Sequence, residues 1–304
     1  MSRARPGLEI VVVGHLSRDL LITPDLTRES LGGGTAYAML APAVGAMGSG
    51  IVTRVGQDFN QEYMNALRMS GLDLTGLRTS GPHTTRFVNI YDAQGNRTQR
   101  VEAVAPSLRG DDYLSHHLHS TIFHFCPLTA AELHLSCLEV ADTSGAFVSL
   151  DVQGYLRAIE GDRVVPRNWD ERDEVLRYVD SVKFDDKELK VAYGKIPEAL
   201  AVEKVTRFGP KIVIVTRDRR GSTIYTRNGH TDIPLVLADK FVDATGCGDT
   251  YTVGFLLEYM RTGDIKRAGL FGATCASYNL ETVGPYDMPS REQVEKRMKP
   301  YLYS

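Results

Sequence analysis

Short apolar runs alternate with segments of helical apolar spacing through most of the chain. Runs rich in β-branched residues that end in glycine or a polar residue predict buried strands of a parallel sheet. These runs are residues 9–14, 51–58 (a strand and its turn), 121–125, 146–151, 181–184 and 211–216. Helical spacing predicts helices at 60–70, 129–141, 170–178, 186–192, 197–207 and 265–280. This alternation predicts an α/β fold with a doubly wound, mainly parallel sheet.

Two regions depart from that alternation. Residues 85–91 and 97–101 flank a polar turn at 92–96, which predicts a β-hairpin. Short strands inserted among strand–helix units indicate a small accessory sheet. Gly32, Gly33 and Gly34 lead into a predicted helix at 35–41, and Pro42 complicates this helix, because a proline inside a helix removes a hydrogen bond and can kink it.

Composition narrows the class of protein. Of 304 residues, 42% are hydrophobic and 24% charged, which is typical of a globular protein of one large α/β domain or two. A net charge of -3 gives no basic bias, so we expect no nucleic-acid partner. No apolar run is long enough for a bilayer or for a signal peptide, so we expect no membrane association. Four cysteines without C-x-x-C spacing favour a reducing compartment, and we predict a cytoplasmic protein.

The segment 243–249, D-A-T-G-C-G-D, carries the strongest chemical signal in the chain. Glycines that run into a helix leave backbone N–H groups unpaired at the positive end of the helix dipole, and such a nest suits a phosphate or an oxyanion. Asp249 is electrostatically unfavourable there unless it has a function, such as accepting a proton from an attacking hydroxyl. The alternative is a glycine turn that caps a core helix, with Asp249 a solvated first-turn acid.

The segment 243–251 resembles the D-x-T-G-x-G-D-T-[YF] signature of the ribokinase-like (PfkB) carbohydrate kinases, with Cys247 where alanine is usual. The resemblance extends over essentially the whole chain. It implies one ribokinase-like domain over 1–304, with lid strands inserted at about 15–35 and 84–102, and often a homodimer formed through the lid. It further implies that Asp249 is the catalytic base and that Gly246, Cys247 and Gly248 form the anion hole.

The same resemblance places the acceptor near the start of the chain. Asp19 follows the first strand and matches the family's early aspartate, which binds substrate hydroxyls; the alternative is a polar loop residue. Gly33 and Gly34 match the glycine pair that lets the backbone approach the substrate. The family's asparagine a few residues later is absent, and Thr35 and Tyr37 occupy that turn. Tyr37 is therefore a candidate acceptor contact, and specificity for ribose is not implied.

The metal and nucleotide candidates lie further along. Residues 150–157 resemble L-D-x-Q-G-x-x-R, and 183–188 resemble N-x-x-E, in which Glu188 organises Mg²⁺. Asp185 stands in place of the asparagine. Its carboxylate also supplies oxygen ligands, which a hard cation accepts. The alternative is that residues 185–188 are only an ordinary helix N-terminus. The resemblance assigns Thr216, Asp218, Gly221 and Asn279 to the nucleotide, and Asp243 and Thr245 to a monovalent cation such as K⁺. Asp218 stands where glycine is usual. Arg217, Arg219 and Arg220 are either phosphate contacts or solvated loop residues.

Four histidines, 116, 117, 119 and 124, do not favour a metal site, because the first three cannot share one helical face and no acid stands at ligand spacing.

The leading hypothesis is a kinase that moves the γ-phosphoryl of ATP, with Mg²⁺, onto a hydroxyl of a small polyhydroxylated molecule: a sugar, a polyol or cyclitol, or a nucleoside. One alternative is a non-catalytic sugar or nucleotide sensor on the same scaffold, against which Asp249 argues. A nicotinamide dehydrogenase is disfavoured because no G-x-G-x-x-G follows the first strand. The acceptor is left open, with some likeness to inositol and nucleoside kinases.

Overall fold

A nine-stranded sheet forms the centre of the computed structural model, which describes residues 7–24, 26–92 and 97–303. The strands run in the order β15-β14-β13-β12-β9-β8-β1-β4-β5. The strands from β13 to β5 are parallel, and β14 and β15 continue the sheet as an antiparallel hairpin. Their bounds are β1 Ile10–Val13, β4 Ser49–Val55, β5 Asp73–Thr79, β8 Ile122–Phe125, β9 Phe147–Asp151, β12 Ser181–Asp185, β13 Ile212–Thr216, β14 Ser222–Thr226 and β15 Gly229–Ile233.

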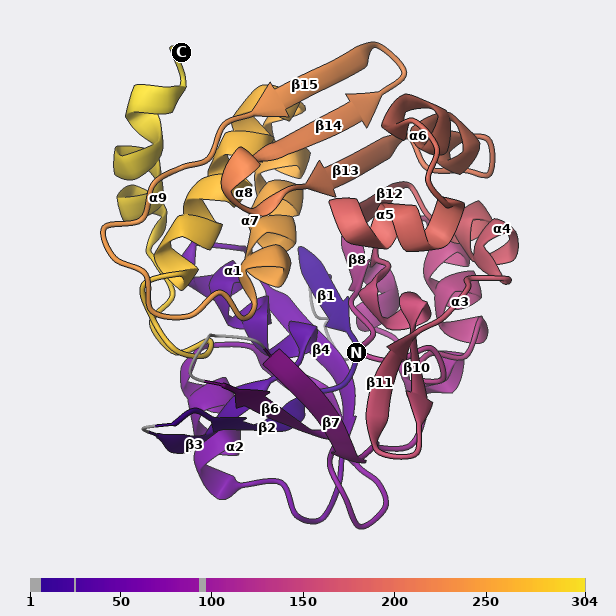
Figure 1. Cartoon of the computed structure of the whole chain (residues 1–304), viewed down its shortest axis with the longest axis vertical. Helices are drawn as coiled ribbons and strands as arrows, with labels where there is room; N and C mark the ends of the chain where they lie inside the picture. Colours follow the sequence, from indigo (N-terminus) through magenta and orange to yellow (C-terminus); the bar gives the residue numbers. More distant parts are fainter. Residues whose placement is uncertain (1–6, 25, 93–96, 304) are drawn as a thin grey trace, which may run out of the picture.

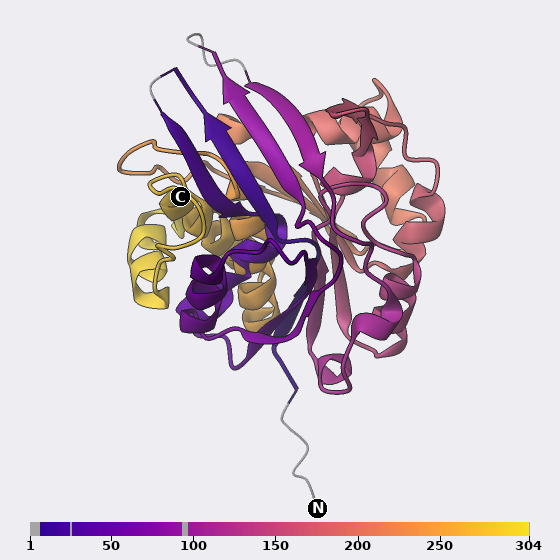
Figure 2. The ribbon, with the colours of Figure 1, turned by 90° about the horizontal axis from the view of Figure 1, so that it is seen from below.

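Helices cover both faces of this sheet (Figures 1 and 2). Successive residues of a strand point to opposite faces, so Ile10 and Val12 join one apolar cluster with α7 and α8, while Val11 and Val13 join another with α3, α5 and α6. The predicted doubly wound α/β fold is confirmed. The helices are α1 Leu40–Ala43, α2 Gln61–Met69, α3 Ser136–Thr143, α4 Arg172–Val175, α5 Asp186–Tyr193, α6 Glu198–Thr206, α7 Cys247–Thr262, α8 Ile265–Asn279 and α9 Arg291–Met298.

A second sheet of six strands, which we call the lid, has the order β10-β11-β7-β6-β2-β3. Figure 2 shows the β2–β3 and β6–β7 hairpins projecting from one side of the body. Both hairpins occupy the two stretches expected from the sequence, whereas β10 and β11 were not predicted. The turn expected at 92–96 lies largely outside the described residues. The bounds are β2 Ser17–Ile22, β3 Thr27–Gly32, β6 Arg86–Tyr91, β7 Arg97–Ala103, β10 Arg157–Glu160 and β11 Arg163–Pro166.

Three predicted helices differ from the structure, and the one expected at 170–178 is the short α4 followed by a 3-10 turn at 176–178. The helix expected at 129–141 begins only at Ser136, because the preceding backbone bonds to another loop: Leu108 N–H donates to Glu132 O and His134 N–H to Leu108 O. The buried Glu132 carboxylate also accepts from His15 N–H at 2.6 Å, so tertiary contacts override helical spacing here. The helix expected at 35–41 is a 3-10 turn at 34–39 followed by the short α1.

None of the helices within the described residues combines the length and the apolar character that crossing a membrane requires.

Candidate active site

The loop before α7 has the geometry of an anion-binding turn. Gly246 is the N-cap of α7 in the left-handed conformation, with φ 79° and ψ 0°, which glycine adopts without strain. Its carbonyl accepts from the N–H and the hydroxyl of Thr250. Within the described chain the N–H groups of Gly246 and Gly248 donate to no other group. They remain available at the positive end of a 16-residue helix.

Asp249 and Asp19 meet on the same glycine turn, although 230 positions separate them. A Cβ added to Gly34 would lie 2.5 Å from Asp249 Oδ1, and one added to Gly32 would lie 2.4 Å from Asp19 Oδ2. Any side chain at either glycine would displace a carboxylate. The turn 32–34 therefore packs against both carboxylates, and its glycines leave room for them.

A buried ion pair lies beneath the anion-binding turn. Lys183 Nζ stands 2.6 Å from Asp151 Oδ2, and both side chains are about 5% exposed. A Cβ on Gly248 would lie 3.0 Å from Lys183 Nζ, so the ammonium reaches the turn itself. Burial alone would lower the pKa of Lys183, but Asp151 raises it above its ordinary value, and the lysine stays charged.

Sequence reasoning gave Lys183 no role. The available signal was a lysine inside the buried run S-V-K-F, because a buried ammonium requires a charged partner.

Two carboxyl groups beside this pair have raised pKa values. Burial, then the nearby Asp151, raises the pKa of Asp249 to about 7, while Lys183 lowers it in part. Burial likewise raises the pKa of Glu188 to about 7, again partly offset by Lys183. Perturbed carboxyl groups gathered around one lysine are typical of catalytic sites.

Tyr37 lies in the turn that follows Gly34 and contacts the turn before α7. Its side chain is 2% exposed, its ring packs on Gly246, and its hydroxyl donates to the Thr245 carbonyl at 3.1 Å. A small pocket on its other side lies between the lid and the loop at 243–245. The pocket is lined by Asp19, Leu21, Arg28, Ser30, Leu31, Gly32, Tyr37, Asn89, Asp243, Thr245, Val283 and Gly284. Among its polar lid residues the sequence had pointed to Asp19, and not to Arg28 or Ser30.

Asp185 and Glu188 form a reciprocal cap at the start of α5. Asp185 Oδ1 accepts from the N–H groups of Lys187 and Glu188, and Glu188 Oε2 accepts from Asp185 N–H at 2.7 Å. One oxygen of each carboxylate is left over. Glu188 also lies within electrostatic reach of Lys183, on the side of the buried ion pair.

The turn at 216–221 stands at the carboxyl end of β13. Thr216 is the register partner of Asp185, so this turn neighbours the carboxylates of α5. Asp218 has φ 45°, a left-handed conformation that is strained for a residue with a side chain. Arg217 pairs with Glu198 and Arg220 with Asp186, so these two arginines are already committed to ion pairs.

Asn279 ends α8 close to the same turn of α7. Its side chain is 4% exposed, and its Nδ2 donates to the Thr245 carbonyl at 2.7 Å and to Cys247 Sγ at 3.4 Å. Its Oδ1 has no hydrogen-bond partner among the described residues. A buried amide oxygen in this state is an acceptor that a bound molecule could satisfy.

Comparison with known proteins gives this geometry a family. Residues 8–292 match the model of the pfkB family of carbohydrate kinases. The chain belongs to this family. It is 28% identical to a cytidine kinase of Thermococcus kodakarensis, over 92% of this chain and 99% of that protein.

Solved structures agree on the fold. A ribokinase of Arabidopsis thaliana in complex with ribose and ATP has a TM-score of 0.80 at 21% identity, covering 96% of this chain and 99% of that one. A pyrophosphate-dependent kinase of the ribokinase family, in a sulfate complex, has a TM-score of 0.80 at 23% identity, covering 94% and 99%.

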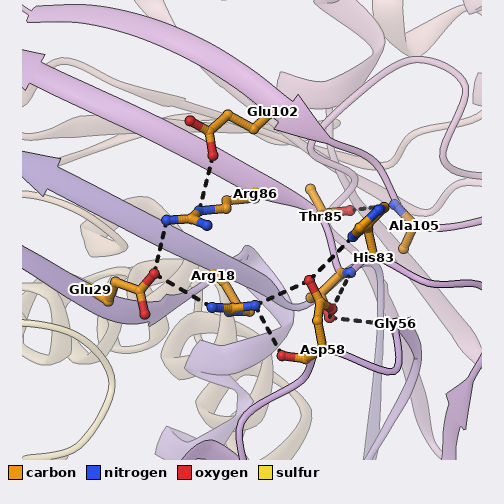
Figure 3. Close-up of polar contacts among 10 residues, drawn as sticks. Arg18, Glu29, Gly56, Asp58, His83, Thr85, Arg86, Glu102 and Ala105 are labelled. Carbon is orange, nitrogen blue, oxygen red and sulfur yellow. Dashed lines mark hydrogen bonds and ion pairs between the residues drawn. The ribbon is translucent and has the colours of Figure 1, made fainter.

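In this PfkB kinase a chain of ion pairs anchors the lid strands, as Figure 3 shows. Arg18 on β2 stands 3.1 Å from Asp58, in the loop after β4, and 3.5 Å from Glu29 on β3. Arg86 on β6 continues the chain to Glu29 at 2.9 Å and to Glu102 on β7 at 3.2 Å. Arg18 precedes Asp19 on the same strand, so the network fixes the strand that carries Asp19 from its opposite face.

In the folded kinase Asp73 lies beside His116 and His117, a contact that the spacing of these residues in the sequence did not reveal. His116 Nε2 stands 3.3 Å from Asp73 Oδ2, and His117 lies beside them. However, His117 Nδ1 accepts from Leu114 N–H at 3.0 Å, so the proton of the neutral ring is on Nε2. That nitrogen, 3.4 Å from Thr75 Oγ1, is a donor and cannot ligate a metal as it stands.

Proposed function

We propose that this kinase transfers the γ-phosphoryl group of ATP to a hydroxyl of a small sugar, cyclitol or nucleoside bound between Asp19 and Asp249. The observation that best supports this proposal is the position of Asp249. It lies in the first turn of α7, its carboxylate packs against Gly34, and Lys183 is close by. The cytidine kinase relative and the ribokinase structure with ribose and ATP support acceptors of this kind.

The residues supply what phosphoryl transfer needs, which is alignment and charge neutralisation. Asp249 takes the proton of the acceptor hydroxyl while that oxygen bonds to the γ-phosphorus. The bond from this phosphorus to the bridging oxygen breaks, and ADP leaves with the electron pair. The N–H groups of Gly246 and Gly248 and the Lys183 ammonium stabilise the charge on the phosphoryl oxygens. A pKa of about 7 suits Asp249 to accept the proton near neutral pH.

Mg²⁺, which the family implies, fits the donors at the start of α5. Asp185 and Glu188 each keep one carboxylate oxygen outside their reciprocal cap, and Mg²⁺ prefers oxygen ligands and retained waters. We infer that these two residues would hold the ion, which neutralises phosphate charge when bound. Thr216, beside Asp185, and Asn279, with its unpaired amide oxygen, would contact the nucleotide.

A coupled kinase assay with cytidine, ribose and myo-inositol as acceptors tests the proposal, with ATP and pyrophosphate compared as donors. Asp249→Asn should keep the fold and nucleotide binding but lower kcat by roughly 10²–10⁴-fold, because the amide cannot take the proton. Asp111→Asn is the matched control, because Asp111 is an exposed acid whose side chain makes no hydrogen bond to any described residue. Near-normal turnover by Asp249→Asn would remove Asp249 from the mechanism.

A further inference from the structure

Side chains bind both backbone polar groups of Thr245. Its N–H donates to Asp243 Oδ1 at 3.0 Å. Its carbonyl oxygen accepts from Tyr37 Oη at 3.1 Å and from Asn279 Nδ2 at 2.7 Å. A carbonyl oxygen has two lone pairs, so both are engaged by protein donors.

The Thr245 carbonyl sets the orientation of the turn before α7. The Thr245 carbonyl and the Gly246 N–H belong to one planar unit, so fixing the first fixes the second. Tyr37 holds the unit twice, through its hydroxyl and through its ring: a Cβ on Gly246 would lie 1.8 Å from Tyr37 Cζ. Tyr37 and Asn279 are 2% and 4% exposed, so water does not compete freely for these bonds.

A monovalent cation does not fit this arrangement. The resemblance to the family assigns such an ion to Asp243 and Thr245, but the Thr245 carbonyl is engaged by two N–H or O–H donors. Asn279 Nδ2 is a donor only, so it presents positive hydrogens where the cation would bind this oxygen. The Thr245 hydroxyl is turned to Asp243 Oδ1, at 2.9 Å.

We propose that Tyr37 and Asn279 hold the Thr245 carbonyl in place of a monovalent cation, so that the anion-binding turn of this kinase forms without K⁺. Tyr37 is then a positioning residue. It lies in the 34–39 turn on the acceptor side, Asn279 lies at the end of α8, and their bonds meet at the start of α7. The acceptor turn and the phosphate turn are thereby joined through one oxygen atom.

The first test asks whether K⁺ binds. The thermal unfolding midpoint of the full chain is measured in KCl, NaCl and tetramethylammonium chloride at equal ionic strength, and Tl⁺ binding is followed by thallium NMR. We expect the same midpoint in all three salts and no bound Tl⁺. A K⁺-specific rise in the midpoint, or bound Tl⁺ displaced by K⁺, would overturn the proposal. These measurements need no acceptor, so they test the proposal even if cytidine, ribose and myo-inositol are all left unphosphorylated.

The second test isolates the Tyr37 hydroxyl, with cytidine as the acceptor probe. Tyr37→Phe keeps the ring and should lower kcat roughly 3- to 10-fold, the worth of one hydrogen bond, with the acceptor KM nearly unchanged. Tyr113→Phe is the matched control, because Tyr113 is also buried and donates to a backbone carbonyl, of Cys137, at 3.2 Å far from the site. A normal kcat in Tyr37→Phe, or an effect confined to the acceptor KM, would contradict the positioning role.

Discussion

At the scale of single residues, Asp249 combines two requirements that conflict. As the proposed general base it must be ionised, yet burial and Asp151 raise the pKa of this carboxyl to about 7. We therefore expect kcat/KM to fall as the pH is lowered through about 7, which a profile between about pH 5.5 and 9 would show. Glu188 has a similar pKa, so Glu188→Gln is the control, and its profile should keep the same acidic limb.

The effect of this group on stability has the opposite sign to its effect on activity. A carboxyl group whose folded pKa is raised stabilises the fold below its unfolded pKa, and that contribution is lost as the pH rises through about 7. Asp249→Asn should therefore raise the unfolding midpoint more at pH 8 than at pH 5. An equal change at both pH values would show that Asp249 has no raised pKa.

Cys247 is the residue at which this chain departs from the signature, and its surroundings favour an inert thiol. Burial raises the pKa of Cys247 to about 11, and its Sγ lies 3.7 Å from the Ala276 carbonyl. We expect alkylating agents at neutral pH to leave Cys247 unmodified in the apo enzyme, because the thiolate is the nucleophile. Mass-spectrometric mapping checks this, and Cys247→Ala should stay active. Rapid modification that ATP prevents would show a reactive thiol instead.

The sequence identified the residues that carry a local pattern and missed those that act through distant contacts. Asp249 and the turn before it are recognisable because the glycines, the acid and the helix are adjacent in the chain. The bonds of Tyr37 and Asn279 to Thr245 join segments that are 208 and 34 positions apart, so no spacing in the sequence predicts them. Lys183 was overlooked because its partner, Asp151, lies on another strand.

At the scale of elements, α7 carries the turn that we propose binds the phosphoryl group, so the position of this helix matters. Glu258 on α7 is fully buried and pairs with Arg267 of α8 and Arg291 of α9, both at 2.5 Å. Glu258→Ala would leave two arginines without their partner, and we expect it to lower the free energy of unfolding by about 3 kcal/mol. The shift of the urea midpoint measures this loss.

An exposed ion pair with the same N–O distance is the matched control for the Glu258 ion pairs. Glu203 and Arg207 on α6 also stand 2.5 Å apart, but both side chains are more than half exposed. Glu203→Ala should cost less than about 1 kcal/mol, because water screens the pair and solvates what remains. Equal losses in the two variants would mean that burial of Glu258 does not determine its contribution.

Element boundaries followed the sequence where the local pattern was undisturbed. The helices at 186–192 and 197–207 were predicted to within a residue at each end. The helix at 129–141 lost its first turns to bonds with the loop at Leu108, a contact that apolar spacing cannot show. The β10–β11 hairpin did carry a signal, the turn residues Gly161 and Asp162 between two short strands, but this signal is weak without its partner β7.

At the scale of the whole molecule, the lid has one face toward the site and one away from it. Asp19 and Leu21 line the pocket, so Leu20 and Ile22 point the other way, and β6 adds Ile90 opposite Ile22. These three apolar side chains are only partly buried in the single chain. The face they form suits a second copy of the chain, as the homodimer expected from the family resemblance requires.

We therefore predict that two copies of the chain form a dimer through their lids. Light scattering after gel filtration should give twice the mass of the chain. Ile22→Asp should give the monomer with an unchanged circular dichroism spectrum, because a carboxylate on this face would have to be desolvated without a partner. Met47→Asp, at a side chain 91% exposed, is the control and should leave the mass unchanged. A monomeric wild type would contradict the dimer, and a dimeric Ile22→Asp would place the interface on another surface.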